Sequence, residues 1–174
     1  MGICKNKIVK RLKLKFMLLF YNYFKHISIK CGDDCEVSHL KLASCGKGNS
    51  IILGDGVKLK NVTISIFGNQ NQLIIHSNNN ISKVRFVMED DGNKIEIGKH
   101  NFIGSNSLLA ALEGTAISIG SNCMIASPCE IRTSDSHSLL DSDGRRINYA
   151  KDIVIGGACL DWNGMPYIKG CIHS

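Results

Sequence analysis

The sequence predicts an all-β protein in which short strands stack as a parallel β-helix, preceded by an amphipathic α-helix. Hydrophobic residues make up 44% of the 174-residue chain, which argues against disorder and suits one domain with a sizeable core. Aromatic residues contribute only 6%, so the core depends on aliphatic side chains. Aliphatic residues also recur at six-residue intervals among Gly, Asn and Ser, and this periodicity predicts a β-helix.

The first segment, residues 1–28, is predicted to contain a basic amphipathic helix from about Lys5 to His26. Its apolar residues fall three or four positions apart, and lysines occupy the other face. The apolar residues are Ile8, Leu12, Phe16, Leu19 and Tyr23. This helix could cover the open end of a stack of strands or rest on an anionic membrane surface, and the sequence favours the first role.

The positive charge is concentrated in the same segment. The formal net charge is +6, and the first thirty residues hold many lysines and no acidic residue. From Cys31 onward the chain is close to neutral. Nucleic-acid binding is therefore a poor explanation of the charge.

Eight cysteines are present, with no secretory signal before them, which predicts a reducing, cytoplasmic setting and free thiols. Cys31 and Cys35 lack the spacing and the second pair of a zinc site. Cys123 and Cys129 are six residues apart, so we expect them to fill equivalent positions in adjacent repeats.

The six-residue register is clearest from Ile97 onward, where an aliphatic residue is often followed by a small one. The aliphatic positions are Ile97, Ile103 and Leu109, and then Ile119, Ile125 and Ile131. One such unit can form one face of a triangular coil, and three units complete the coil. The aliphatic side chains point inward and stack on their equivalents one coil away, while the small residue allows the corner.

Upstream the register is looser. Strands are predicted at Ile51–Gly54, Val62–Gly68 and Leu73–His76, separated by turns such as Gly68-Asn69 and 77–80. Asn-rich corners suit the left-handed backbone conformations that turns require. We assign these strands to early coils, so that the β-helix covers residues 29–156.

A specific motif follows the last clear repeats. Ile131-Arg132-Thr133-Ser134-Asp135-Ser136-His137 is followed by a polar loop, residues 138–150, and then by 151–156, Lys-Asp-Ile-Val-Ile-Gly. This order resembles the hexapeptide-repeat acyltransferases, closest to the O-acetyltransferases of bacterial polysaccharides and sialic-acid polymers. The resemblance implies a left-handed β-helix, acetyl-CoA as acyl donor without a metal, a carbohydrate acceptor, a homotrimer and a role in polysaccharide biosynthesis.

The resemblance also implies that His137 is the catalytic base. An imidazole can take the proton of a sugar hydroxyl as the oxygen attacks the thioester. Asp135 or Ser136 could orient the ring, and the spacing alone does not distinguish them. Arg145, Arg146 and Asn148 are candidates to bind an acidic sugar, because arginine pairs well with carboxylates. A solvated loop is the alternative for these three residues.

The remaining histidines carry no motif. His100 is expected to face outward from a repeat, and His26, His39 and His76 are expected to be surface or helper residues. A zinc enzyme of the carbonic anhydrase type would need three histidines brought together from nearby coils. The repeat region offers only His100 and His137, so we do not favour a metal site.

The register stops after Gly156. Reading Ala158–Asn163 one base later, with permitted codons, gives a segment typical of the family at this point. We therefore predict that residues 157–174 are an out-of-frame tail, through a sequencing error or a disrupted gene. The family's acetyl-CoA groove lies between neighbouring subunits and uses the coils that this tail replaces. The expected consequence is poor solubility and little or no activity.

Two other functions remain open at this point. One is acetylation of a small acceptor of the serine or antibiotic type on the same scaffold, because the fold does not fix the acceptor. The other is a non-catalytic remnant that keeps the β-helix without the groove. The N-terminal helix weakly favours a large or membrane-proximal acceptor, and the acceptor sugar and its hydroxyl position are not predicted.

Overall fold

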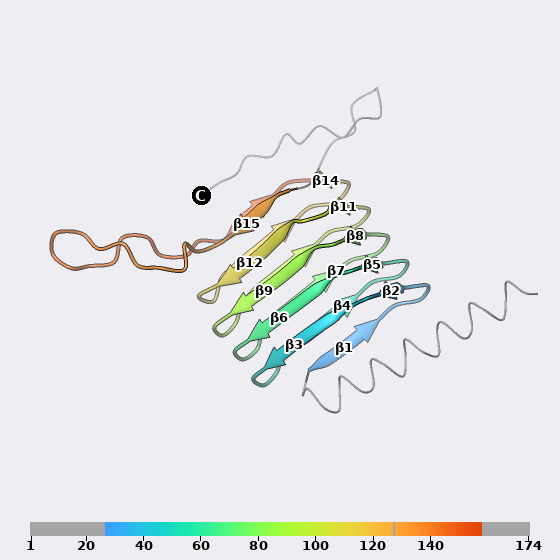
Figure 1. The fold of residues 1–174 in the computed structure, drawn as a ribbon, viewed down its shortest axis with the longest axis horizontal. Helices are drawn as coiled ribbons and strands as arrows, with labels where there is room; N and C mark the ends of the chain where they lie inside the picture. Colours follow the sequence, from blue (N-terminus) through green and yellow to red (C-terminus); the bar gives the residue numbers. More distant parts are fainter. Residues whose placement is uncertain (1–26, 127, 158–174) are drawn as a thin grey trace, which may run out of the picture.

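The computed structural model describes residues 27–126 and 128–157, and in these ranges the chain forms sixteen β-strands and no helix. The strands form three parallel sheets that wind around one axis as a β-helix (Figure 1). Sheet A contains β1 (Ser28–Cys31), β4 (Ser50–Leu53), β7 (Gln72–Ile75), β10 (Lys94–Ile97), β13 (Ala116–Ile119) and β16 (Ile153–Ile155). Sheet B contains β2 (Glu36–Ser38), β5 (Lys58–Lys60), β8 (Asn80–Ser82), β11 (Phe102–Ile103) and β14 (Met124–Ile125). Sheet C contains β3 (Lys41–Cys45), β6 (Thr63–Phe67), β9 (Arg85–Glu89), β12 (Leu108–Leu112) and β15 (Glu130–Arg132). The predicted all-β solenoid is confirmed.

One coil holds 22 residues, four more than three hexapeptides would give. In sheet A, Ser28 pairs with Ser50, Gln72 with Lys94, and Lys94 with Ala116, all in parallel register. The backbone hydrogen bonds follow the same step, as in Ser50 N–H to Asn71 O at 2.9 Å. Each coil therefore places every side chain directly above its equivalent in the coil before.

The spacing of inward residues within the coil explains why a six-residue period was clear only late in the chain. From Ile97, inward residues follow at steps of six, six and ten, through Ile103, Leu109 and Ile119. In earlier coils the steps are six, five and eleven. The inward residues there are Leu53, Leu59, Ile64, Ile75, Ile81, Phe86 and Ile97. The change occurs where Leu109 pairs with Phe86, 23 residues earlier in the chain.

The core is a set of aliphatic columns. Alternate residues of each strand point inward, as the two-residue period of a strand requires, and the strand β4 is buried only at Ile51 and Leu53. Ile51, Leu73, Ile95 and Ile117 stack in one column of sheet A. Each such side chain contributes about 1.5–3 kcal/mol when fully buried. Cys123 and Cys129 also pack with this core, on neighbouring faces of the same coil.

Buried asparagines form a ladder at the corner between sheets C and A. Asn49, Asn71 and Asn93 occupy the same position in successive coils and are at most 1% exposed. The Asn71 backbone N–H donates to Asn49 Oδ1 at 2.9 Å, and the Asn93 N–H donates to Asn71 Oδ1 at 2.8 Å. The Asn71 amide in turn donates to Asp90 O at 2.9 Å. These side chains satisfy backbone groups that the corner would otherwise leave without partners.

A second ladder lies at the corner between sheets A and B. The Asn79 amide donates to His76 O at 2.6 Å and to Gly98 O at 2.7 Å, and Asn79 Oδ1 accepts from Asn101 N–H at 2.8 Å. Asn101 Oδ1 accepts from Cys123 N–H at 2.6 Å. The ladder therefore runs through three coils.

Other asparagines supply the expected left-handed turns. Asn61, Asn78, Asn106 and Asn122 have φ values between 52° and 63°. At the corner after sheet C the turn requires glycine, because a Cβ at Gly68 (φ 119°) would lie 2.2 Å from the backbone oxygen of Asp90.

The predicted N-terminal helix, from about Lys5 to His26, lies outside the described residues, and so does the out-of-frame reading of Ala158–Asn163. In the part of the chain that the structure describes, no helix is long and apolar enough to cross a membrane. Five cysteines there are free thiols: Cys31, Cys35, Cys45, Cys123 and Cys129.

Candidate active site

The polar loop leaves the β-helix between β15 and β16. Ala116 and Asp152, which meet in the stack, are 36 residues apart instead of 22, so the excursion adds 14 residues. Its two ends are tied to the coils. Lys151 N–H donates to Thr133 O at 3.0 Å, and the Asp152 carboxylate accepts from Ala116 N–H at 2.8 Å. The loop therefore projects from a fixed base, as Figure 1 shows beyond β15.

His137 lies at the start of this loop, and its ring is held by a backbone carbonyl. The ring Nδ1 is 2.8 Å from Asp135 O. A carbonyl oxygen only accepts hydrogen bonds, so Nδ1 carries the proton and Nε2 of the neutral ring keeps its lone pair. Ser136, between the two residues, has φ 60°, which turns the chain back on itself. His137 is exposed, so its Nε2 can receive a proton from a substrate.

The expected side-chain role of Asp135 is taken by its main chain. The Asp135 carboxylate does not bind the ring but accepts from the amide of Asn148 at 2.9 Å. Ser136 contributes its backbone N–H, which donates to Ser134 Oγ at 3.2 Å. Both residues named from the sequence thus lie next to His137, and Asp135 orients the ring through its carbonyl oxygen.

An ionic network lies beside His137. Glu113, in the turn after β12, accepts from Arg146 at 2.8 Å and from Ser134 Oγ at 2.6 Å, both on Oε1. The Arg146 hydrogen bond is the main cause that lowers the pKa of Glu113 to about 2, and the Ser134 hydroxyl adds to the effect. The same carboxylate raises the pKa of Arg146. Glu113 is therefore ionised throughout the physiological range, and its low pKa makes it a weak base.

The two loop arginines have different roles in this geometry. Arg146 binds Glu113, donates to Asn148 O at 3.0 Å, and lies 5.3 Å from the ring centroid of Tyr149. Arg145 is exposed and has one long ion pair, 3.6 Å from the carboxylate of Asp143. Arg146 is already engaged within the loop, whereas Arg145 can reach a ligand.

A cavity of about 210 Å³ adjoins His137. It is lined by Leu112, Ser136, Ser138 and four charged residues, namely Glu89, Asp90, Glu113 and Arg146. Three carboxylates and one paired guanidinium give this cavity a negative character. A neutral hydroxyl fits beside His137, but an acidic group on the same ligand would have to lie outside the cavity.

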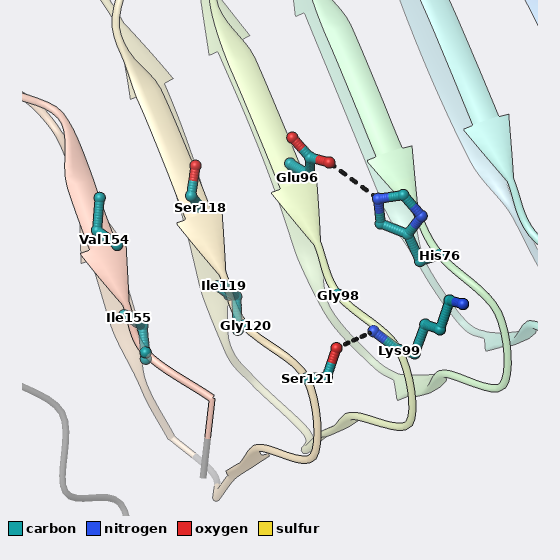
Figure 2. Close-up of a pocket in the computed structure, with 11 residues that line it drawn as sticks. His76, Glu96, Gly98, Lys99, Ser118, Ile119, Gly120, Ser121, Val154 and Ile155 are labelled. Carbon is teal, nitrogen blue, oxygen red and sulfur yellow. Dashed lines mark hydrogen bonds and ion pairs between the residues drawn. The ribbon is translucent and has the colours of Figure 1, made fainter.

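A second, larger groove, of about 590 Å³, lies at the other end of the sheet A strands and was missed from the sequence. Figure 2 shows Glu96 pointing to His76 of the neighbouring coil, with Nε2 and Oε1 2.8 Å apart. Glu96 also pairs with Lys94 at 2.7 Å. A signal was present, because His76 stands where the adjacent coils have Gly54 and Gly98. The His76 hydrogen bond lowers the pKa of Glu96.

Metal binding gains no support from the geometry. Within residues 27–126 and 128–157, no three His, Cys, Asp or Glu side chains come together in a way that could hold a metal ion. His100 lies in an exposed corner with φ 58°, in the turn before β11.

Comparison with solved structures gives a clear neighbour. The chain is similar to the polySia specific acetyltransferase NeuO, with a TM-score of 0.66 and 30% sequence identity. The likeness covers 76% of this chain and 56% of that chain, so this chain spans little more than half the length of its neighbour. No family model matches the sequence, and none of the curated proteins does.

Proposed function

We propose that this left-handed β-helix, which shares its fold with a polySia specific acetyltransferase, is an acyltransferase. The proposed reaction transfers an acetyl group from acetyl-CoA to a hydroxyl of a bacterial surface polysaccharide or sialylated glycan. The supporting observation is the geometry of His137, whose Nδ1 is fixed by Asp135 O at 2.8 Å while Nε2 remains free.

The proposed chemistry needs one base and two bound substrates. His137 Nε2 takes the proton of the sugar hydroxyl as the oxygen forms a bond to the acetyl carbon. The carbon–sulfur bond of the thioester then breaks, and the proton passes from the imidazolium to the departing thiolate. Holding the hydroxyl and the thioester side by side supplies the rest of the rate increase. Neither a covalent enzyme intermediate nor a metal is part of this proposal.

In this proposal, the charged residues around His137 determine where the acceptor sugar binds. The negative cavity beside His137 favours a neutral hydroxyl there, and Arg145 is the exposed cation on the same loop. In this proposal, Arg145 binds the carboxylate of an acidic sugar outside the cavity. Arg146 and Asn148, which were expected to bind the sugar, are hydrogen-bonded to Glu113 and Asp135 respectively, so the proposal gives the sugar-binding role to Arg145.

Assembly and location are part of the proposal. His137 is exposed in the single chain, and a general base works better where bulk water is excluded. A homotrimer, in which a neighbouring subunit covers this face and helps to form the acetyl-CoA groove, would provide that exclusion. We also propose a cytoplasmic enzyme of polysaccharide biosynthesis that can contact the inner membrane through residues 1–28.

The test is transfer by the full 174-residue chain. Purified protein is incubated with acetyl-CoA and sialic-acid oligomers, and thiol release and O-acetylation by mass spectrometry are followed. The variant His137→Ala is expected to lose about 10²–10⁴-fold in rate, while the exposed His100→Ala keeps it. Undiminished transfer by His137→Ala would rule out this base.

The same assay separates the alternatives. Transfer to serine or to antibiotics, but not to sialic-acid oligomers, would indicate a small-acceptor enzyme. A chain that has β-structure by circular dichroism but does not bind acetyl-CoA in calorimetry would be a non-catalytic scaffold.

A further inference from the structure

Asn148, near the end of the loop, is hydrogen-bonded to residues at its start: Asp135, His137 and Leu139. We propose that Asn148 is a positioning residue, which closes the loop and keeps the His137 ring in the form that can accept a proton. This inference rests on the proposed function for its catalytic meaning. It replaces the expectation that Asn148 binds the acceptor sugar.

The amide of Asn148 uses its full hydrogen-bonding capacity inside the protein. Its NH2 group donates to Asp135 Oδ2 at 2.9 Å and to His137 O at 2.8 Å. Its Oδ1 accepts from Leu139 N–H at 2.7 Å and, more weakly, from Arg146 Nε at 3.4 Å. An amide offers two donors and two acceptor lone pairs. No capacity is left for a sugar.

The orientation of the amide is also fixed. Its oxygen faces two N–H donors, and its nitrogen faces a carboxylate and a carbonyl oxygen. A flipped amide would turn its NH2 group toward two N–H donors and its oxygen toward two oxygen acceptors, so only one orientation of the amide satisfies the four contacts. Asparagine is the side chain that satisfies it, because it combines both kinds of group at this length.

The contacts surround the catalytic ring. Asp135 supplies the carbonyl oxygen that accepts from His137 Nδ1, and Asn148 binds the side chain of that same Asp135. Asn148 also binds the carbonyl of His137 itself and the N–H of Leu139, so the backbone on both sides of His137 is held. If these contacts are lost, the segment 135–139 can rotate away and release Nδ1 from Asp135 O. The ring could then carry its proton on Nε2, and Nε2 would have no lone pair with which to accept a proton from the substrate.

Two pairs of variants separate positioning from simple packing. Asn148→Asp keeps the shape and the acceptor oxygen but loses both donors and places a second carboxylate beside Asp135. The adjacent Ile147→Ala is the control, because Ile147 is 63% exposed and contributes its backbone N–H to Leu139 O. Asp135→Asn keeps an oxygen that can accept from Asn148, whereas Asp135→Ala removes it. The ring partner, the backbone carbonyl of residue 135, is retained in both.

The measurement is nitrogen NMR of the full chain with labelled histidine, with His137→Ala identifying the His137 signals. The wild type, Ile147→Ala and Asp135→Asn are expected to show the neutral ring protonated on Nδ1. Asn148→Asp and Asp135→Ala are expected to show a mixture that includes the Nε2-protonated form. In turnover, kcat of Asn148→Asp should fall about 10- to 100-fold, with KM for the glycan little changed.

The inference is overturned if Asn148→Asp keeps the Nδ1-protonated ring, or if it raises KM for the glycan at unchanged kcat. It is also overturned if Asp135→Asn alters the ring as much as Asp135→Ala, because the charge of Asp135 would then be what matters. The ring signals test the inference even if no transfer is detected. Turnover that survives in His137→Ala contradicts the proposed function instead, so the two failures are distinguishable.

Discussion

The guanidinium of Arg146 lies 2.8 Å from the carboxylate of Glu113, which is 33 residues earlier in the chain. This ion pair ties the projecting loop to the turn after β12, on the coil before the one that ends at His137. Both side chains are about one-quarter exposed, so water weakens the pair without removing it. The loop is therefore held by charge at this point and by the Asn148 amide at another.

The ion pair predicts a specific acid dependence. The pKa of Glu113 is lowered from 4.5 to about 2, so its ionised form is favoured in the folded protein. The contribution is complete above about pH 4.5 and is lost as the pH falls towards 2. Thermal unfolding of wild type and Glu113→Gln should differ by a constant amount from pH 7 to pH 5, and the two should converge below. A difference that persists unchanged at pH 2 would contradict this assignment.

The two loop arginines predict a separation of effects. Arg146→Ala removes the contacts to Glu113, Asn148 and Tyr149, so the loop should open and be cut several-fold faster by chymotrypsin. Arg145→Ala should leave the cleavage rate unchanged, because Arg145 pairs only weakly with Asp143. In the transfer assay it should instead raise KM for an acidic glycan more than for a neutral one. Equal cleavage of both variants would show that Arg146 does not hold the loop.

The asparagine ladder predicts a large difference between two adjacent residues. Asn79 is buried and makes three hydrogen bonds to backbone groups, whereas Asn80 is exposed on the outer face of β8. Asn79→Ala leaves those groups buried without partners, at a cost of about 1–3 kcal/mol for each. Asn80→Ala should change the free energy of unfolding by less than about 0.5 kcal/mol. Urea unfolding measures both, and similar values would argue against the ladder.

The thiols of the first coil predict unusual reactivity. The side-chain interaction between the Cys31 and Cys35 thiols is the main cause that lowers the pKa of Cys35 from 9.0 to about 7 and raises the pKa of Cys31. Because the thiolate is the nucleophile, alkylation of Cys35 by iodoacetamide should reach half its maximal rate near pH 7. Removing the partner thiol in Cys31→Ala should move that midpoint upward. Peptide mapping by mass spectrometry gives both curves, and identical midpoints would exclude the interaction.

The sequence predicted the β-helix and the position of His137 because both depend on local pattern. From Ile97, aliphatic residues repeat at two successive steps of six, through Ile103 and Leu109, and the motif around Asp135 is contiguous. The 22-residue coil was not predicted, because the shorter step from Leu59 to Ile64 breaks the hexapeptide spacing in the early coils. Strand positions there were nevertheless close to the observed ones, since each is a short run of aliphatic residues next to turn residues.

The contacts across coils were the part that the sequence did not predict. Asn71 looks like a turn residue, and only the stacked backbone shows that its amide is buried. His76 meets Glu96 because the coil length places them in adjacent coils. The role of Asn148 depends on how the loop folds back on Asp135, which no local pattern encodes. These interactions follow from three-dimensional register rather than from residue type.

The loop returns to the stack at the position it would have held without the excursion, with Ile153 paired to Ile117 and Ile155 to Ile119. The coils on either side therefore experience no displacement from the inserted stretch. Mutations, insertions or exchanges between its anchors at Thr133 and Lys151 would leave the stack beneath them unaltered. The stretch can therefore change in sequence or length while the scaffold stays constant, and a protein engineer can graft a foreign loop between the same two anchors.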